Sequence, residues 1–173
     1  MKRLSKYVGV SIIVVFVMFS FLYFNDNIGI SKLRIEKDAR IASKIDDRWQ
    51  VAKDTTNTMS AMLFYNTSLE DHRFSIYVNR KGLSYGYFFR GGGSLIVDDV
   101  DIADYYIDGY QERAYMSINK QQIIKMEIDD GNTIETIKID NTKPFSIVLP
   151  INQGIVKFYD INGDTVEPIK IPL

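Results

Sequence analysis

The longest hydrophobic segment of the chain runs from Tyr7 to Phe24 and contains no charged residue. In a helix that rises about 1.5 Å per residue, such a segment covers roughly 27 Å, close to the hydrocarbon thickness of a bilayer. Tyr7 and Tyr23 stand near its two ends, where amphipathic rings favour the membrane interface. The pattern predicts a transmembrane helix over 7–24, preceded by a cytoplasmic tail of residues 1–6.

The charges around this segment predict its orientation. Three basic residues and no acidic residue precede it: Lys2, Arg3 and Lys6. The positive-inside rule then places the N-terminus in the cytoplasm and the rest of the chain outside. Lys32 and Arg34 follow the segment and weaken this asymmetry. We expect a single-pass protein of the cell membrane whose C-terminal domain lies outside.

The residues that end the segment favour an uncleaved anchor over a signal peptide. Signal peptidase sites need small residues in an A-x-A-like pattern, whereas residues 21–26 are large or polar. The chain has no cysteine, which excludes a cysteine-linked lipid anchor. Whether the segment is removed in the cell stays open from the sequence.

A helical pattern follows in residues 25–70. Apolar or small residues recur along one side of a helix in two interleaved seven-residue series, Ile35, Ala42, Trp49, Thr56 and Leu63, and Ile45, Ala52 and Met59. We predict a helical stalk or, preferably, a helix packed on its own domain. A parallel coiled coil that makes the protein a dimer is the alternative, weakened by the small size of several members. The stretch 54–57 is a poor helix interior.

After Asp71 the period of the pattern changes to alternation, which predicts a β domain over 71–173. Seven or eight short strands joined by tight turns indicate an antiparallel sheet or a β-sandwich. No βαβ alternation is present, so a parallel sheet is not expected. The predicted fold class is therefore α+β.

Turn residues mark the hairpins within this domain. Residues 79–82 join strands over 74–78 and 83–89, and Asn162-Gly163 forms a second tight turn. Asp130-Gly131 joins 124–128 to 134–138. A two-residue loop there sets Ile124 opposite Ile137, and a one-residue shift sets Ile128 opposite Ile134. Neither register keeps one face apolar, so we expect a bulge near Gly131, and the register stays open. A strand over 145–149 ends at Pro150, and 98–109 is predicted to be irregular.

Composition narrows the possible classes of function. After the hydrophobic segment, 18 Lys and Arg residues face 22 Asp and Glu residues, a net charge of −4. This mild acidity argues against nucleic acid and anionic lipid as partners. The absence of cysteine excludes thiol catalysis and cysteine-bound metal sites, and it fits an extracytoplasmic bacterial protein that does not use disulfides.

Acidic residues offer the best candidate metal site. Five lie in the segment 98–108, namely Asp98, Asp99, Asp101, Asp104 and Asp108. Calcium prefers six to eight oxygen ligands, which a loop of carboxylates can supply. A solvated acidic loop is the favoured interpretation, and calcium binding by 98–108 stays open. The segment 160–164 departs from a calcium loop at its sixth and twelfth positions and is interpreted as a hairpin turn.

The remaining motifs do not define an active site. His72 is the one histidine, and no nucleophile signature accompanies it. The glycine-rich stretch 90–94 lacks the lysine and helix of a phosphate-binding loop, so it is interpreted as a bulge or loop. We therefore assign no catalytic, cofactor-binding or metal-binding residue and no cofactor, and we favour a protein that is not an enzyme.

The aromatic stretch 85–89 is the strongest binding candidate. Its rings fall on both faces of a strand, and one face is expected in the core. Core and sheet packing is the favoured interpretation of the stretch, and an interface or a sugar-stacking platform on the other face is the alternative. The leading hypothesis is an anchored domain that binds a protein partner or an envelope component. The alternative is an envelope hydrolase that acts on glycan or peptide through Asp and Glu. An exposed aromatic patch favours the first, and a concave acidic cleft favours the second.

Overall fold

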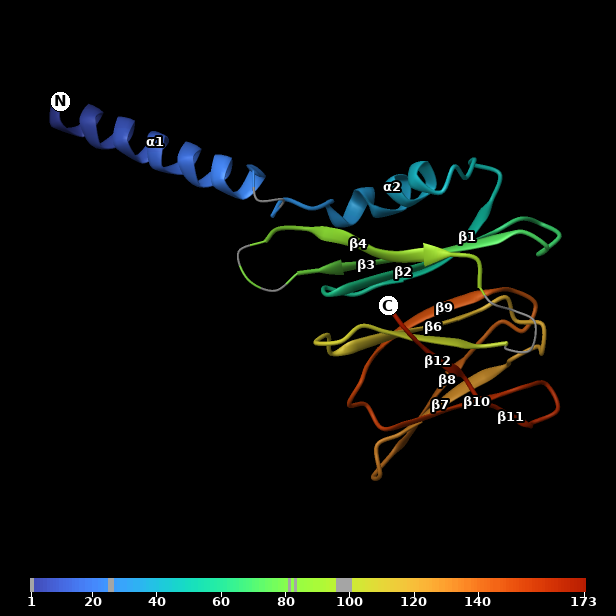
Figure 1. Ribbon diagram of the computed structural model, residues 1–173. Helices are drawn as coiled ribbons and strands as arrows, with labels where there is room; N and C mark the ends of the chain where they lie inside the picture. The colour runs from blue at the N-terminus through green and yellow to red at the C-terminus, as the bar shows by residue number, and fades with distance from the viewer. Residues whose placement is uncertain (1, 25–26, 81, 83, 96–100) are drawn as a thin grey trace.

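The computed structural model describes residues 2–24, 27–80, 82, 84–95 and 101–173 of the 173-residue chain. A long helix projects from a layered β domain (Figure 1). The elements are α1 (Lys2–Phe24), η1 (Lys32–Arg34), α2 (Ile35–Ala42), β1 (Gln50–Thr55), β2 (Met59–Tyr65), β3 (His72–Asn79), β4 (Tyr87–Gly93), β5 (Ala103–Tyr106), β6 (Glu112–Ser117), β7 (Lys125–Asp129), β8 (Ile134–Lys138), β9 (Phe145–Pro150), β10 (Ile155–Tyr159), β11 (Thr165–Val166) and β12 (Ile169–Pro172).

The fold is α+β, as the sequence predicts, with a small helical part and three sheets. The strand orders are β1-β2-β3-β4, β12-β5-β6-β9 and β11-β10-β7-β8, here called the first, middle and third sheets. The prediction of seven or eight strands in 71–173 is too low, because the described residues of this range form ten of the twelve strands, and β1 and β2 precede it. All neighbouring strands are antiparallel except β12 and β5, which pair in parallel at one edge of the middle sheet.

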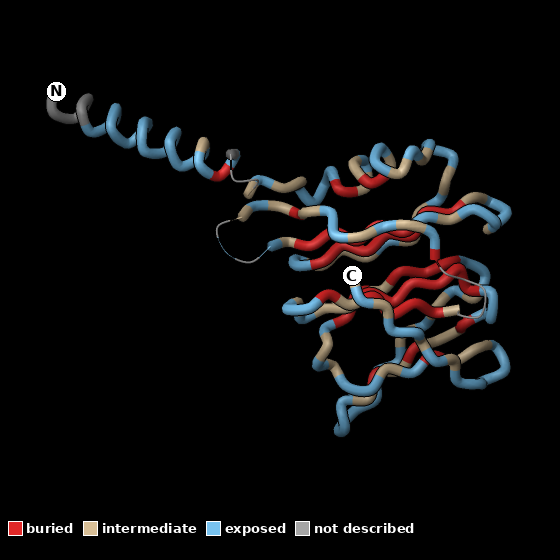
Figure 2. The backbone as a smooth tube through the Cα atoms, viewed as in Figure 1, coloured by how far each residue is buried: buried red, intermediate tan, exposed pale blue. Residues whose placement is uncertain are grey.

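Three buried clusters hold the layers together. One fills the space between α2 and the first sheet, the second lies between the first and middle sheets, and the third lies between the middle and third sheets. The middle sheet is therefore covered on both faces, and Figure 2 shows buried residues on its central strands. Two hydrogen bonds also join the first two sheets, from Ser146 Oγ to Ala61 O at 3.1 Å and from Val148 N to Asp54 Oδ2 at 2.9 Å.

Helix α1 exposes apolar side chains over most of its length. Phe16 and Tyr7 are each 71% exposed, and Leu22, near the end that joins the domain, is buried. Within the described residues, no helix is long and apolar enough to cross a membrane.

The helical segment predicted over 25–70 is wrong beyond Ala42. Helix α2 ends there, and β1 and β2 occupy 50–55 and 59–65. Every residue of β2 is buried, because α2 covers one face of this strand and the middle sheet covers the other. Its continuous apolar run therefore belongs to a strand with two buried faces. Ile35 and Ala39 pack against the first sheet, so the packed-helix interpretation holds for 35–42 and the longer coiled-coil stripe does not form.

The hairpins are confirmed with longer loops than expected. Strands β3 and β4 pair antiparallel, and Gly82 in their connection has a φ of +101°, which favours glycine. Strands β7 and β8 pair with Met126 opposite Ile137, a register that differs from both of the alternatives that the sequence offers. The reason is a four-residue loop, in which Asp130 N donates to Thr133 O at 3.2 Å.

Strand β5 lies where the pattern predicts irregular chain, and this is a further correction. In the middle sheet Asp104 stands opposite Tyr115 on one side and Lys170 on the other. Its neighbours Ala103 and Tyr105 point into the cluster between the first and middle sheets. Because side chains alternate along a strand, Asp104 points towards the third sheet. Asp104 alternates with Ala103 and Tyr105 as in any strand, but β5 is four residues long and lies in a segment with five aspartates, so the sequence pattern does not identify it.

Candidate functional site

The aromatic stretch 85–89 divides between core and surface along its length, and not between the two faces of the strand as the alternation suggests. Tyr87 is buried beneath α2 and donates from its hydroxyl to Thr56 O at 2.6 Å. Phe88 is half-buried, and the Arg80 guanidinium carbon lies 4.0 Å from the centre of its ring. Tyr85 and Phe89 are 60% and 54% exposed. Two aromatic rings of this stretch are therefore available to a ligand.

Phe89 forms one wall of a groove on the outer face of the first sheet. The groove has a volume of about 330 Å³ and lies beyond the C-terminal end of α2, which covers only part of that face. It is lined by Phe89, Arg73, Gly92 and Gly93 and by Ala42 and Ser43 at the end of the helix. The name Phe89 groove is used below for these six residues.

The glycines make the floor of the Phe89 groove. A Cβ atom added at Gly92 would lie 2.8 Å from Phe74 O and 3.2 Å from the Phe89 ring, so only glycine lets that ring lie close to the strand. The ring also packs edge-on against Tyr77, with centroids 5.5 Å apart. Phe89 is therefore held in place while more than half of it stays exposed.

Arg73 supplies the charge in the Phe89 groove. Its guanidinium donates to Ser94 Oγ at 3.2 Å, and the side chain is exposed. An aromatic face, a guanidinium and open backbone together suit sugars and peptides, which present apolar CH faces together with hydroxyl, carbonyl or carboxylate oxygens. The sequence signal for Phe89 was its aromatic strand, whereas nothing in the pattern distinguished Arg73 from other exposed basic residues.

A second candidate is a small polar pocket of about 180 Å³ between the middle and third sheets. Asp104, Arg113 and Tyr115 of the middle sheet form one wall, and Glu167 and Lys170 lie at its rim. Arg113 Nη1 donates to Asp104 Oδ2 at 2.9 Å, and the Asp104 side chain is 1% exposed. Among the described residues, Asp104 Oδ1 and Arg113 Nε have no hydrogen-bond partner.

Burial dominates the electrostatics of this pocket. Loss of hydration raises the pKa of Asp104 above its ordinary value, although Arg113 and Lys170 act in the opposite direction. Burial likewise raises the pKa of Tyr115. The pocket is smaller than the roughly 300–1,000 Å³ of typical ligand sites. It has room for several water molecules, and water is the natural partner for the two unpaired atoms.

The acidic residues of 98–108 do not converge where the structure describes them. Asp101 accepts hydrogen bonds from the backbone N–H groups of Lys120 and Gln121, Asp104 pairs with Arg113, and Asp108 is exposed. Asp98 and Asp99 lie outside the described residues. Within the described ranges, no group of three or more His, Asp or Glu side chains is placed to hold a metal ion.

The other sequence candidates have structural roles. His72 donates through Nε2 to Leu95 O at 3.3 Å. Asp160 closes the turn over 160–164, where its Oδ1 accepts from Asn162 N at 2.8 Å and from Asp164 N at 2.9 Å, so the hairpin-turn interpretation is confirmed. The glycine-rich stretch belongs to β4, which shifts its pairing with β3 between Ile76 and Tyr77.

Comparisons with family models, with curated proteins and with solved structures gave no match for this chain.

Proposed function

We propose that this protein is anchored in the cell membrane by α1 and that its β domain, outside the cytoplasm, binds a protein partner or an envelope component in the Phe89 groove. The sequence supports the anchor, because residues 7–24 carry no charge and follow three basic residues. The exposed apolar side chains of α1 add to this support, since a helix that is apolar on all sides needs an apolar environment.

The half-exposed ring of Phe89 carries the binding part of the proposal. Isolated exposed apolar residues are common on protein surfaces and need no explanation. This ring is different, because it is fixed against Tyr77 and Gly92 and lies beside an arginine in a groove. A ligand that stacks on the ring meets a surface whose conformation is already set, which lowers the entropy cost of binding.

Site-specific photo-crosslinking in intact cells tests the proposal. The full chain carries a photoreactive amino acid at Phe89 or, as a matched control, at Ile161, which is 53% exposed in a turn of the third sheet. We expect a discrete crosslinked product from position 89 and none from 161. The substitution Arg73→Gln, placed in the chain with the probe at 89, is expected to reduce the yield several-fold.

Two results contradict the proposal. Recovery of monomer alone from position 89 removes the groove as a binding site. Equal yields from 89 and 161, or a yield that Arg73→Gln leaves unchanged, show that the crosslink reports collisions at the surface and not a site.

An envelope hydrolase is the second candidate, and one observation favours it. Asp104 and Glu167 line the same pocket, and burial raises the pKa of Asp104 in the direction that suits a general acid. The ion pair with Arg113 and the small volume of the pocket favour the binding protein instead. Hydrolysis of purified envelope glycan or peptide that is lost in Glu167→Gln would establish the enzyme, and equal product from the variant would remove it.

A further inference from the structure

The end of α1 is tied to the domain by a short series of backbone hydrogen bonds. Asn27 N donates to Leu22 O at 2.9 Å, and Asn27 O accepts from Tyr85 N at 2.8 Å. The next bond runs from Gly29 N to Tyr85 O at 2.6 Å. The connection between β3 and β4, which carries Tyr85, is therefore held beside the last turn of the helix.

Chain length leads to the same placement. Residues 25 and 26 alone separate α1 from Asn27, and the three Cα–Cα steps from Phe24 to Asn27 reach at most roughly 11 Å. If α1 is anchored in a bilayer up to Phe24, the near end of the domain cannot lie farther than this from the end of the span. The headgroup layer on each side of the hydrocarbon core is roughly 5–8 Å deep, so the near end of the domain lies within this layer or within a few ångströms of its outer edge.

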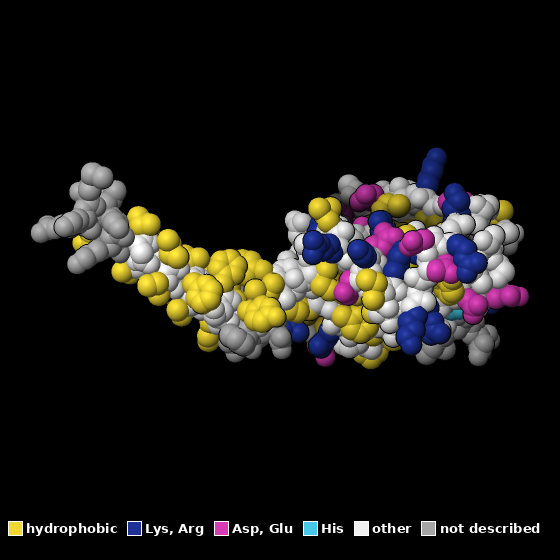
Figure 3. Space-filling model, turned by 90° about the horizontal axis from the view of Figure 1, so that it is seen from above, with side chains coloured by type: hydrophobic (Ala, Val, Ile, Leu, Met, Phe, Trp, Pro, Cys, Tyr) yellow, Lys and Arg dark blue, Asp and Glu magenta, His cyan; other side chains and the backbone are white. Residues whose placement is uncertain are grey.

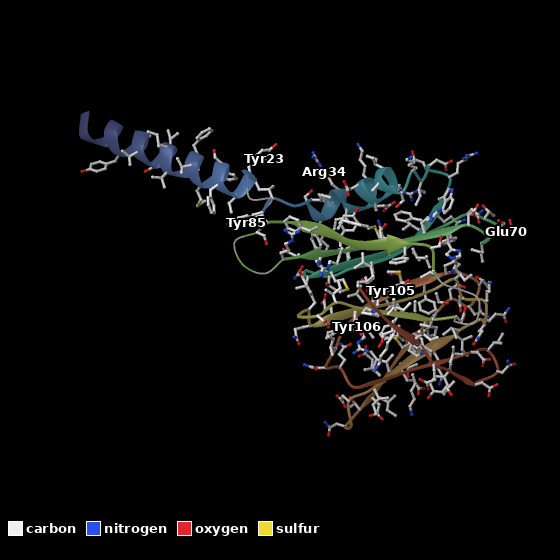
Figure 4. All side chains as sticks on the ribbon, in the orientation of Figure 1. Tyr23, Arg34, Glu70, Tyr85, Tyr105 and Tyr106 are labelled. Atoms are coloured by element: carbon white, nitrogen blue, oxygen red, sulfur yellow. The ribbon has the colours of Figure 1, made fainter. Side chains whose placement is uncertain are left out.

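The surface at this end of the domain is both apolar and basic. Leu33 is 97% exposed, Tyr85 is 60% exposed and Ile28 is 44% exposed. Lys32 and Arg34 flank Leu33 on η1, and neither takes part in an ion pair among the described residues. These five residues are called the neck surface. Figure 3 shows hydrophobic and basic side chains next to α1, and in Figure 4 Tyr23, Tyr85 and Arg34 lie around the junction.

A groove continues the basic character of the neck surface along α2. It has a volume of about 620 Å³, and Arg34, Lys37 and Asp38 are its charged lining residues. Asp38 accepts a hydrogen bond from Tyr77 at 2.7 Å, so part of its acceptor capacity is already used. The domain as a whole is acidic, but this end presents cations suited to phosphate oxygens.

We propose that the neck surface lies in the headgroup layer of the membrane that holds α1, with Leu33 and Tyr85 at the acyl boundary and Lys32 and Arg34 on lipid phosphates. This inference rests on the proposed anchor. Leucine and tyrosine with adjacent basic residues are the composition expected of an interfacial contact. The contact restricts how the domain can turn about the end of α1, and it therefore sets the direction in which the Phe89 groove faces.

Spin labels at single cysteines test the placement, and the cysteine-free chain needs no background substitutions. Four variants of the full chain each carry one spin label, at Leu33→Cys, Tyr85→Cys, Ile161→Cys or Ile13→Cys. Each variant is reconstituted in vesicles of equal parts phosphatidylcholine and phosphatidylglycerol. Accessibility to oxygen, which concentrates in lipid, is compared with accessibility to a water-soluble nickel chelate. We expect the oxygen-to-nickel ratio at 33 and 85 to exceed that at 161 several-fold, and the ratio at 13 to be highest.

Charge is tested in the same assay. The double substitution Lys32→Gln and Arg34→Gln, combined with the label at Tyr85→Cys, should lower the ratio towards that of Ile161→Cys. The matched control, Lys138→Gln and Lys157→Gln on the third sheet, should leave it unchanged. Vesicles of phosphatidylcholine alone should also lower the ratio, because the anionic headgroups are absent.

The outcomes separate the two proposals. A high ratio at 13 with water-like values at 33 and 85 overturns the neck-surface contact and leaves the anchor standing. A water-like value at 13 overturns the anchor and the contact together. Strong dipolar broadening between labels at 33, with low access to both reagents, shows that a second copy of the chain covers the surface and overturns the lipid contact.

Discussion

The two faces of the middle sheet differ in the polarity of their buried residues, although the same strands form both faces. The face towards the first sheet is apolar, with Ala103, Tyr105, Ala114 and Met116 in one buried cluster. The face towards the third sheet has an apolar cluster around Phe158 and, at its open end, the buried pair of Asp104 and Arg113. The interface with the first sheet combines an apolar cluster with hydrogen bonds such as that from Ser146 Oγ to Ala61 O. The interface with the third sheet combines an apolar cluster with an ion pair at its open end.

The difference shows that neighbouring buried residues of one strand can contribute very differently to the free energy of folding. Tyr105 stacks on Phe74 with centroids 4.4 Å apart, and burial raises its pKa to about 12 without any charge being formed near neutral pH. Asp104, the preceding residue, has to lose water as a carboxylate, and Arg113 only partly offsets this loss. The apolar face therefore stabilises the fold, while the polar end adds little net stability and holds unpaired atoms.

The largest loss of stability is expected from a substitution at the centre of the interface between the middle and third sheets. Phe158 is fully buried and packs against Tyr115 at 5.2 Å and Phe145 at 6.0 Å between ring centroids. Phe158→Ala should lower the free energy of unfolding by about 3–5 kcal/mol, and Met116→Ala on the other face by about 2–5 kcal/mol. Urea unfolding of the full chain in detergent, followed by circular dichroism and by Trp49 fluorescence, measures both.

The same experiment tests whether the layers are one cooperative unit. Coincident transitions for both probes in both variants are expected, because the middle sheet belongs to both cores. If Phe158→Ala moved the circular dichroism transition and left the Trp49 transition in place, the third sheet would unfold by itself and the comparison of two faces of one unit would fail.

Breaking the ion pair between Asp104 and Arg113 should lower stability by a smaller amount, and replacing both residues with apolar ones should restore most of it. Asp104→Ala leaves Arg113 without its partner, and we expect a loss of about 2–3 kcal/mol, below the usual cost of breaking a buried pair because Arg113 is 23% exposed. Replacing both residues, Asp104→Leu with Arg113→Met, should restore most of this stability. A double variant as unstable as the single one would show that the pair itself contributes net stability.

Sequence patterns predicted the elements whose neighbours are local and failed where burial depends on distant layers. The alternation in β3, β6 and β9 and the turn at Asn162-Gly163 are properties of short segments, so the sequence reveals them. The apolar run of β2 lies between α2 and the middle sheet, and only the assembled layers explain why a strand there is apolar on both faces.

The candidate sites show the same difference between local features, which the sequence reveals, and contacts between distant segments, which it does not. The sequence singles out the aromatic strand that carries Phe89, but it places Phe89 on the same face as Tyr87, which is buried, and so it does not predict that the Phe89 ring is exposed. Its partners Arg73 and Gly92 come from β3 and β4, and they meet the end of α2 only after folding. The sequence does not reveal the pairing of Asp104 with Arg113 across β5 and β6 for a similar reason, because Asp104 is one of five aspartates in 98–108 and this segment resembles an irregular acidic loop.

The smallest expected effect is a difference in pH dependence between a buried and an exposed aspartate. Burial raises the pKa of Asp104, so the folded protein binds its proton more readily than the unfolded chain does, and this group favours folding as pH falls from that raised pKa to the ordinary value of 3.8. Asp140 is the reverse case. Hydrogen bonds from Thr142 and Lys143 lower its pKa to about 2, so its contribution is complete above 3.8 and is lost as pH falls towards 2.

Substitution of Asp104 and substitution of Asp140 should therefore change the pH dependence of the free energy of unfolding at acid pH in opposite directions. The free energy of unfolding should fall less steeply with acid in Asp140→Asn than in the parent protein, and more steeply in Asp104→Asn, measured as slopes so that differences in baseline stability cancel. The window also differs, since the Asp104 change lies above 3.8 and the Asp140 change lies below it. Parallel slopes for Asp104→Asn and the parent would mean that Arg113 outweighs burial, and the polar end of the interface would then resemble an ordinary surface ion pair.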